Sequence, residues 1–377
     1  MKEAGYVIFA FLYSIFKYFP LKKNSGFLIV THDSGPEGNG AVVAAYMERM
    51  YHTRFSKLVR KDTSFGGSGG IMRALRFFFL KSWEMAGAEF IFMDNAFLPM
   101  AYLRVRKETT VVQLWHGTGT VKKFGQHVNT GKLYEQEKRA NENIDYVIVN
   151  SMATKALYAG CFSVPKEKVM VLGLPRTDLL FSDRELLRRR ARFFKQHPEL
   201  LNKKLILYAP TFRDSEVANP TVHLDLEKMA EELPKDSCLV LRLHPFVAER
   251  FHLEKDYDGK IVDFSSYDNL NTLLMVADIL VTDYSSIIFE YCVFGRPMIF
   301  YAYDLEEFSD QGRGFYRNYE EYVPGPIVRN TEELVDVIRE KKWTREKLQA
   351  FLKDSYAYMD GKSAKRVADF VVKNSKV

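Results

Sequence analysis

The stretch TTVVQLWHGTGTVKKFG, residues 109–125, decides how the rest of the sequence is interpreted. Residues 109–114 form a largely apolar, β-branched run that predicts a buried strand. This run leads directly into Trp115 and His116, two glycines, two threonines and a pair of lysines. A turn needs only the glycines, so the imidazole and the lysines indicate that an anionic group binds where the strand ends.

Similar apolar runs alternate with helical patterns on both sides of this stretch. Strands are expected at 27–31, 90–93, 109–114, 146–149 and 169–172, and then at 205–208, 239–243, 261–264, 279–282 and 298–301. Helices are expected between them, at 41–50, 71–84, 134–143, 152–158, 224–233, 270–276, 287–294 and 332–339. Near-continuous apolar strands that alternate with helices are typical of parallel sheets covered on both faces. The sequence therefore predicts an α/β protein with two doubly wound domains.

The length of 377 residues is comfortable for two domains. We expect the first domain at 24–183, the second at 184–344, and the last helices at 345–377 to pack back across the domains. Ligands of open α/β sheets bind at the carboxyl ends of the strands, where the strand order reverses. With two such domains, this rule predicts a ligand site in an interdomain cleft.

Composition narrows the class of protein. A net charge of +6 suits an anionic substrate or membrane surface but is too weak to indicate nucleic acid. The cysteines, Cys161, Cys238 and Cys292, are widely spaced and predict no disulfide framework, which fits a reducing cytoplasm. No DxD pair precedes a strand end, no His/Cys cluster has metal-ligand spacing, and the sequence has no GxxxxGK[ST] loop, so we expect no metal or cofactor. If the bound anionic group is a diphosphate, its charge would then be neutralised by arginine side chains, hydroxyl groups and helix N-termini.

The N-terminal segment 1–23 contains YVIFAFLYSIF at 6–16, which is too short for a confident transmembrane span. Two interpretations stay open: a helix on the membrane surface, or a helix packed on the first domain. IMRALRFFFLKSW at 71–83 mixes basic and aromatic residues, which suits an anionic leaflet. For ELLRRRARFFK at 185–195, ordinary helix packing is favoured. In the 71–83 segment, membrane contacts are expected from Arg73, Arg76, Phe77, Phe78, Phe79 and Lys81.

Polar residues follow several of the expected strands. Beyond HGTGT, these motifs are LGLPRTD at 172–178, YAPTFRD at 208–214, LRLHP at 241–245 and VTDYSSIIFEY at 281–291. Each is weak alone, because a histidine at a strand end is more often structural and a Ser-Ser pair is often a helix cap. Together they suit transfer of a phosphate-bearing group, in which one histidine deprotonates an acceptor hydroxyl and another stabilises phosphate charge.

These motifs, in this order, resemble the CDP-glycerol glycerophosphotransferase family of wall teichoic acid synthesis. The resemblance covers roughly 109–314 and ends in the motif QGRGFY at 311–316. It implies a GT-B-like fold of two Rossmann-type domains, with the first binding the acceptor and the second binding CDP-glycerol. It also implies transfer of glycerol phosphate, or ribitol phosphate in sister enzymes, from a CDP-alditol to an undecaprenyl-diphosphate-linked acceptor, with release of CMP.

The resemblance also assigns roles to residues. His116 and His244 match the two essential histidines. The residues expected to contact CDP-glycerol are Gly117, Thr118, Gly119, Thr120, Arg176, Thr211, Arg213, Arg242, Ser285, Ser286 and Glu290. Gly119 departs from the family, which commonly has proline at this position.

The acceptor is expected at THDSGPEGNGAVV, 31–43, whose glycines have the wrong spacing for a dinucleotide fingerprint. The residues expected to contact it are His32, Asp33, Gly38, Asn39 and Gly40. The alternative, a plain turn in which Asn39 caps a helix, stays open.

The sequence lacks the long N-terminal extension of the family's polymerases, which favours the priming step. We therefore expect transfer of glycerol phosphate from CDP-glycerol to undecaprenyl-diphosphate-linked ManNAc-GlcNAc by a peripheral protein on the cytoplasmic face of the membrane. Three alternatives stay open: a short glycerol- or ribitol-phosphate transferase or polymerase that adds later units, a GT-B glycosyltransferase that uses a nucleotide-sugar, and a non-catalytic membrane-bound binding protein.

Overall fold

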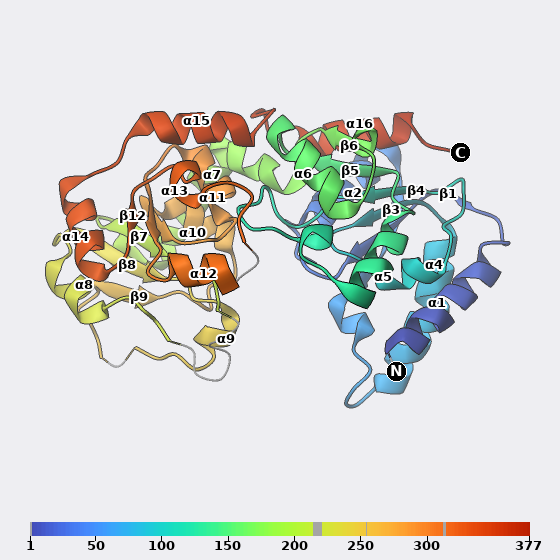
Figure 1. Cartoon of the computed structure of the whole chain (residues 1–377), viewed down its shortest axis with the longest axis horizontal. Helices are drawn as coiled ribbons and strands as arrows, with labels where there is room; N and C mark the ends of the chain where they lie inside the picture. The colour runs from blue at the N-terminus through green and yellow to red at the C-terminus, as the bar shows by residue number, and fades with distance from the viewer. Residues whose placement is uncertain (1, 214–220, 254, 312–313) are drawn as a thin grey trace. The chain divides into compact units, whose positions relative to one another are not determined.

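The computed structural model describes residues 2–213, 221–253, 255–311 and 314–377 (Figure 1). The chain forms two compact units, each built around its own parallel sheet. The first unit comprises Met1–Gly119, Phe124–Asp178 and Ser355–Val377, and the second comprises Thr120–Lys123 and Leu179–Asp354. The expected α/β class with two doubly wound units is confirmed.

The sheet of the first unit has the order β2-β1-β3-β4-β5-β6, and every neighbouring pair is parallel. Its strands are β1 (Lys22–Val30), β2 (Arg54–Val59), β3 (Ala88–Met93), β4 (Thr110–Gln113), β5 (Tyr146–Val149) and β6 (Val169–Val171). The strand order reverses between β1 and β3. The carboxyl ends of these two strands are therefore where a ligand is expected.

The helices of the first unit are α1 (Lys2–Phe16), α2 (Asn39–Tyr51), α3 (Gly70–Leu75), the π-helical η2 (Arg76–Lys81), α4 (Ser82–Ala86), α5 (Gly131–Asn141), α6 (Met152–Phe162) and α16 (Ser363–Lys373). The last helix, α16, buries Val367 and Val371 in the same apolar core as Val43 and Met47 of α2. The Asp178 carboxylate accepts the backbone N–H groups of Ser363 and Ala364 at 2.7 and 2.8 Å. The C-terminal helix thus completes the first unit.

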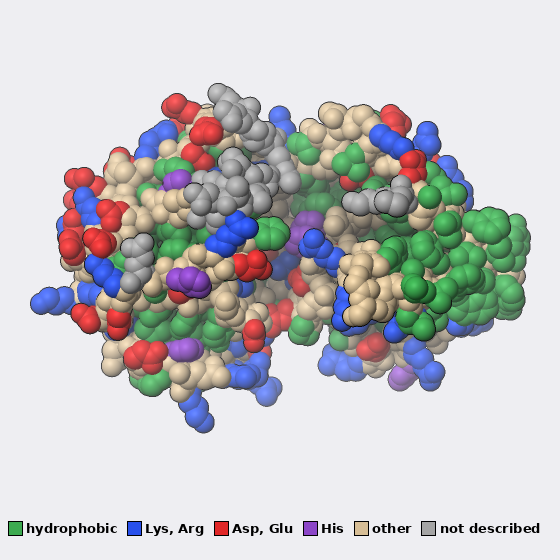
Figure 2. All heavy atoms as spheres, turned by 90° about the horizontal axis from the view of Figure 1, so that it is seen from below, with side chains coloured by type: hydrophobic (Ala, Val, Ile, Leu, Met, Phe, Trp, Pro, Cys, Tyr) green, Lys and Arg blue, Asp and Glu red, His purple; other side chains and the backbone are tan. Residues whose placement is uncertain are grey.

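Helix α1 packs on the first unit along one face and leaves the other face exposed. Phe9 and Tyr13 are fully buried, and the Phe9 ring lies 4.9 Å from the ring of Phe77. Large apolar side chains remain exposed on α1 and on the neighbouring α3 and η2, and they form one green surface in Figure 2. The most exposed of them are Val7, Ile8, Phe11, Ile15, Ile71, Met72, Leu75, Phe79 and Leu80. None of the described helices is long and apolar enough to cross a membrane.

The structure buries two of the six expected membrane contacts in segment 71–83. Phe77 is only 4 % exposed, because its ring packs against Phe9. Lys81 is 7 % exposed and donates to Glu84 at 2.8 Å. Arg73 donates its guanidinium N–H groups to carbonyl oxygens of the preceding loop, including that of Ser64 at 2.8 Å. Arg73 and Phe78 are half-buried, and Arg76 and Phe79 are exposed.

The sheet of the second unit has the order β12-β11-β10-β7-β8-β9 and is also parallel throughout. Its strands are β7 (Lys204–Tyr208), β8 (Ser237–Leu241), β9 (Ile261–Asp263), β10 (Ile279–Thr282), β11 (Met298–Tyr301) and β12 (Ile327–Val328). Its helices are α7 (Asp183–Gln196), α8 (Leu226–Glu232), α9 (Pro245–Ala248), α10 (Leu270–Val276), α11 (Ile287–Tyr291), α12 (Leu305–Gln311), α13 (Tyr319–Tyr322), α14 (Thr331–Glu340) and α15 (Arg345–Ser355). The order reverses between β7 and β10.

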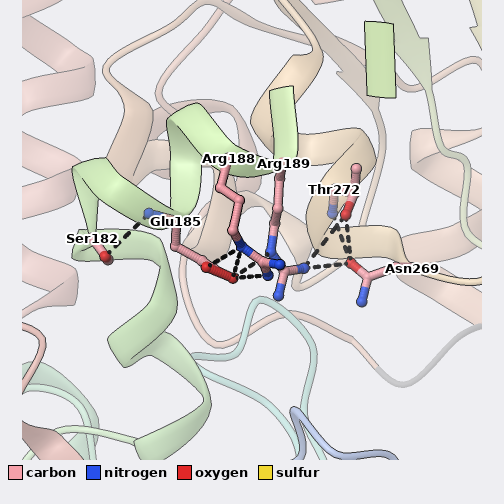
Figure 3. Close-up of polar contacts among 6 residues, drawn as sticks. All are labelled: Ser182, Glu185, Arg188, Arg189, Asn269 and Thr272. Carbon is pink, nitrogen blue, oxygen red and sulfur yellow. Dashed lines mark hydrogen bonds and ion pairs between the residues drawn. The ribbon is translucent and has the colours of Figure 1, made fainter. Parts of the chain in front are cut away.

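Helix α7, which contains the basic segment 185–195, is fixed within the second unit by polar contacts (Figure 3). The Ser182 hydroxyl accepts the Glu185 N–H at the start of the helix. Arg189 donates to the side-chain oxygen of Asn269 at 3.0 Å, and the same oxygen accepts the Thr272 N–H in the first turn of α10. This segment therefore packs as an ordinary helix.

Candidate functional site

Two loops of the first unit are joined where its strand order reverses. Asp94, which follows β3, accepts the backbone N–H groups of Thr31 and Asp33 at 3.0 and 2.7 Å and that of His32 at 3.3 Å. Asp94 is 2 % exposed, and this burial raises the pKa of its carboxyl above the ordinary value, although the hydrogen bonds oppose the shift. The carboxylate thereby fixes the loop that carries His32 and Asp33.

His116 lies beside this loop in a defined orientation. Its Nδ1 is 2.8 Å from the backbone oxygen of Asp94. Because a carbonyl oxygen only accepts, Nδ1 carries the proton and Nε2 of the neutral ring carries a lone pair. The ring stacks face to face on His32, with a centroid distance of 3.6 Å and an interplanar angle of 8°. Burial, His32 and Arg176 lower the pKa of His116 to about 3, so its imidazole is neutral near pH 7.

Asn39 and Arg176 hold the backbone under His116. The Asn39 amide donates to the Trp115 carbonyl at 3.0 Å, and its oxygen accepts the Arg176 N–H at 3.0 Å. The Arg176 guanidinium donates to the His116 carbonyl at 2.7 Å and lies 3.7 Å from the Asp33 carboxylate. Asn39 therefore does not cap α2, since it is the first helical residue and Gly38 occupies the N-cap position. Arg176, expected at the donor, lies in the first unit.

The glycines of the predicted acceptor loop serve close packing in this structure. A Cβ on Gly40 would lie 2.8 Å from the Val30 side chain, and one on Gly38 would lie 2.6 Å from the Asp33 carbonyl oxygen. Gly117, Thr118 and Gly119 are also buried. His32 and Asp33 are thus the members of the predicted acceptor set whose side chains reach the surface beside His116.

In the second unit, Arg213 is a buried ion-pair centre. Its guanidinium donates to both carboxylate oxygens of Asp304 at 2.7 and 3.0 Å and lies 2.8 Å from the Asp283 carboxylate. The rings of Tyr284 and Phe308 lie 5.0 and 5.1 Å from it. Burial alone would lower the pKa of Arg213, but the bonds to Asp304 and the charge of Asp283 raise it. With 7 % exposure, Arg213 supports the loop after β7.

Hydroxyl groups gather at the carboxyl ends of β7 and β10. The Asp283 carboxylate accepts the Thr211 N–H at 2.8 Å, and the Thr211 hydroxyl has no hydrogen-bond partner among the described residues. Ser285 accepts only a long bond of 3.4 Å from the Ile287 N–H, and the exposed Ser286 makes no side-chain cap to α11. Capping thus accounts poorly for the two serines. Glu290 is buried on α11.

His244 follows β8, the strand next to β7. Its Nδ1 accepts the Phe246 N–H at 3.4 Å, so the neutral ring carries its proton on Nε2. The exposed ring stacks on Phe212 with a centroid distance of 5.0 Å. Arg242 is half-buried and donates to the Phe264 carbonyl at 3.4 Å. His244 and the hydroxyls of Thr211 and Ser286 therefore follow three adjacent strands, β8, β7 and β10.

The lysines after the HGTGT loop belong with the second unit. The Lys123 N–H donates to the Gly314 carbonyl at 3.0 Å, and Lys122 forms an isolated bridge with Phe315. The Lys122 ammonium lies 5.6 Å from the Phe308 ring. Thr120 lies in the same unit and donates its hydroxyl proton to the Lys122 carbonyl. The loop thus leaves the first unit after Gly119.

Sequence reasoning missed Asp94 and Asp304. Asp94 directly follows β3, and Asp304 lies three residues beyond the end of β11. The strand-end rule that selected His116 would therefore also have found these two residues. No group of three His, Cys, Asp or Glu residues in the described ranges is arranged to hold a metal ion.

Comparison with known proteins gives a consistent result. The model of the family described as CDP-Glycerol:Poly(glycerophosphate) glycerophosphotransferase matches residues 11–373. The teichoic acid ribitol-phosphate primase of Bacillus spizizenii is 33% identical over 92% of either chain. The teichoic acid glycerol-phosphate primase of Bacillus subtilis is 32% identical over 76% of this chain and 74% of its own.

Longer relatives match only in part. The teichoic acid poly(ribitol-phosphate) polymerase of Bacillus spizizenii is 32% identical over 97% of this chain, which spans only 59% of the polymerase. Among solved structures, the wall teichoic acid polymerase TagF superposes with a TM-score of 0.78 at 23% identity, covering 97% of this chain and 93% of that one. A TagF variant soaked with CDPG gives a TM-score of 0.77. These structures establish the shared fold.

Proposed function

The chain belongs to the CDP-glycerol:poly(glycerophosphate) glycerophosphotransferase family, and from that premise we propose that it is a transferase of teichoic acid synthesis. It moves an alditol phosphate from a CDP-alditol to an acceptor hydroxyl. The acceptor oxygen forms a bond to the phosphorus next to the alditol, the bond to the CMP phosphate breaks, and CMP leaves.

The observation that carries the proposal is the protonation pattern of His116. Its Nδ1–H is committed to the Asp94 carbonyl, so Nε2 is the atom that can take the proton of the acceptor hydroxyl. A base with a pKa of about 3 is weak, but a bound phosphate places negative charge beside the ring and raises that pKa. The anionic substrate would thus activate the base that its own reaction needs.

His244 has the complementary pattern. Its Nε2–H is a donor, which suits a phosphate oxygen of the CDP-alditol or the phosphate of the departing CMP. The exposed hydroxyl of Ser286 supplies a further donor at the same edge of the second sheet, whereas the Thr211 hydroxyl is buried. We assign the nucleotide donor to this edge.

More specifically, we propose that the protein catalyses the priming step, in which glycerol phosphate passes from CDP-glycerol to undecaprenyl-diphosphate-linked ManNAc-GlcNAc. A relative named as a glycerol-phosphate primase supports this form. Transfer of ribitol phosphate is the second candidate, because the relative that matches over 92% of both chains is named as a ribitol-phosphate primase.

The test is incubation of the protein with a disaccharide-diphospholipid and either CDP-glycerol or CDP-ribitol, with CMP release and product mass as readouts. His116→Gln and His244→Ala should each cut turnover by about 10² or more, as loss of a proton-transfer or charge-stabilising group does. His252→Gln, a change at an exposed histidine of the second unit outside the site, is the matched control. Transfer from UDP- or CMP-sugars, or wild-type turnover by folded His116→Gln, would contradict the proposal.

We further propose that the protein binds the cytoplasmic face of the membrane peripherally through the apolar surface of α1, α3 and η2. A diphospholipid acceptor stays in the bilayer, and contiguous exposed apolar side chains on a soluble unit mark an interaction surface. Phe11 and Ile71 are 64 % and 82 % exposed. Phe11→Ser with Ile71→Ser should abolish co-sedimentation with vesicles, whereas Leu187→Ser on α7, which removes a side chain 67 % exposed, should not.

A further inference from the structure

A polar cavity lies at the opposite end of the first sheet from His116. It has a volume of about 590 Å³ and opens at the amino ends of β1 and β2. Its polar lining comes from Lys22, Lys23, Asn24, His52, Arg54 and Ser56. Strand β1 runs from Lys22 to Val30 before His32 follows, a span of about 25 Å at the usual rise per residue. The cavity is therefore separate from the candidate active site.

The cavity concentrates positive charge. Lys22, Lys23 and Arg54 are exposed, and no ion pair joins any of them to a carboxylate in the part of the chain that the structure describes. The one acidic residue in the lining, Glu84, is held by the Lys81 ammonium at 2.8 Å. The nearby Glu89 accepts the Asn24 N–H at 2.9 Å and the Ser375 hydroxyl proton, and does not line the cavity. Among the described residues, the three cations of the cavity are thus not paired with a carboxylate.

The backbone forms the cavity through local irregularities. The register of β1 against β3 shifts between Lys22 and Gly26, and Asn24 has a left-handed φ of 52°. His52, which ends α2, also has a left-handed φ, of 54°. The Phe55 ring crosses Gly26 so closely that a Cβ there would lie 2.0 Å from it. Glycine is required at this position because any side chain would displace the aromatic wall.

The cavity lies next to the apolar surface. The Lys22 ammonium lies 5.6 Å from the Trp83 ring, and Trp83 contacts Phe16 and Phe19 at ring distances of 5.3 and 4.9 Å. Phe19 is 50 % exposed. A ligand in the cavity would thus meet basic side chains on one side and, past Trp83, the aromatic side chains of Phe16 and Phe19 at the end of α1 and just beyond it. This pairing matches an anionic headgroup attached to acyl chains.

We propose that this cavity binds the phosphate of an anionic phospholipid headgroup. The proposal rests on the membrane contact proposed above and adds a specific lipid site to it. A phosphodiester presents acceptor oxygens to Lys22, Lys23 and the Arg54 fork. Lipid binding here would anchor the first unit at a fixed position on its membrane surface.

The test compares two variants with the same loss of charge. Lys23→Gln with Arg54→Gln removes two cavity cations, and Lys166→Gln with Arg49→Gln removes two exposed cations of the same unit outside the cavity. Each basic group close to an anionic surface contributes about fivefold to binding. We expect the cavity variant to bind phosphatidylglycerol-containing vesicles about 25-fold more weakly, and the control variant to lose much less. Equal losses would overturn the proposal, because they would indicate general attraction only.

Two further experiments identify the source of the phosphate and distinguish a failure of the headgroup site from a failure of the apolar membrane contact. Short-chain phosphatidylglycerol, used below its micelle concentration, should bind to wild-type protein in calorimetry and not to the cavity variant, whose thermal midpoint is checked for folding. Inorganic phosphate that binds as tightly would overturn the lipid assignment. If Phe11→Ser with Ile71→Ser leaves vesicle binding intact while short-chain lipid still binds the cavity, the apolar contact fails and the headgroup site stands.

Discussion

At the scale of single residues, the two candidate histidines hold their protons on different ring nitrogens. The Asp94 carbonyl keeps a proton on Nδ1 of His116, whereas the Phe246 N–H keeps Nδ1 of His244 unprotonated. One ring therefore offers a lone pair at Nε2 and the other offers a donor there. Strand-end position predicted both residues, but the opposite tautomers depend on backbone atoms of distant residues, which the sequence does not reveal.

His32 should set the pH at which His116 becomes protonated. Burial is the largest cause of the low pKa of His116, and His32 is the next. His32→Phe keeps an aromatic ring that can stack on His116 but removes the charge interaction by which His32 lowers the pKa of His116. The pKa of His116 should therefore rise. Because the base must be neutral, the acidic limb of the kcat/KM profile should move to higher pH. A profile with an unchanged limb and a uniformly lower rate would mean that His32 only supports the fold.

Arg213 should matter for stability rather than for donor affinity. Its guanidinium is buried between Asp283 and Asp304, and removal of one member of a buried ion pair leaves uncompensated charge. Arg213→Met should therefore lower the free energy of unfolding by about 3 kcal/mol or more in urea titration. Arg192→Met, at an exposed position on α7, is the control. If Arg213→Met is as stable as wild type and only its KM for the CDP-alditol rises, the original expectation that Arg213 contacts the donor would be supported instead.

At the scale of elements, segment 71–83 shows the limit of pattern reading. Its pattern predicted a helix at 71–84, and the unbroken succession of α3, the π-helical η2 and α4 confirms it, but the pattern did not predict which side chains are buried. A π-helical turn holds more residues than an α-helical turn, so it changes which side chains face inward. Phe77 is buried and Phe79 is exposed. Strand β2 was missed because half of its RFSKLV sequence is polar and most of the strand is at least partly exposed.

Helix α16 should depend on Asp178 for its attachment. This carboxylate accepts two N–H groups at the start of the helix, and loss of a capping side chain costs about 1–2 kcal/mol. Asp178→Ala should lower the free energy of unfolding by that amount and increase hydrogen exchange along α16. Asp336→Ala, at an exposed position of α14, should change neither quantity. Equal stability of the two variants would exclude the capping role.

At the scale of the whole molecule, the sequence predicted the fold class well. Long apolar runs such as AEFIFM of β3 and SCLVL of β8 are fully buried, and such runs leave few alternatives to parallel strands. The division of the chain differs in detail, because the units separate at Asp178 rather than 183, and residues 120–123 join the second unit. These choices depend on contacts between distant segments, which no local pattern encodes.

The net charge of +6 should make membrane binding sensitive to salt. Attraction of exposed basic groups to an anionic leaflet is screened beyond about 8 Å at physiological ionic strength. Binding to anionic vesicles should therefore weaken as salt rises, and Arg76→Glu should weaken it further and flatten its salt dependence. Vesicle co-sedimentation across a salt series measures both effects. Binding that is independent of salt in both proteins would show that apolar contact alone is responsible.

The return of the chain to the first unit at Ser355 also fixes the order in which the units can be completed during synthesis. A ribosome has made every residue of the second unit once it passes Asp354. The first unit, begun earlier, still lacks α16 and the apolar side chains that cover α2. The first unit, most of which is made first, is thus the last to finish folding. It must avoid aggregation while the second unit forms.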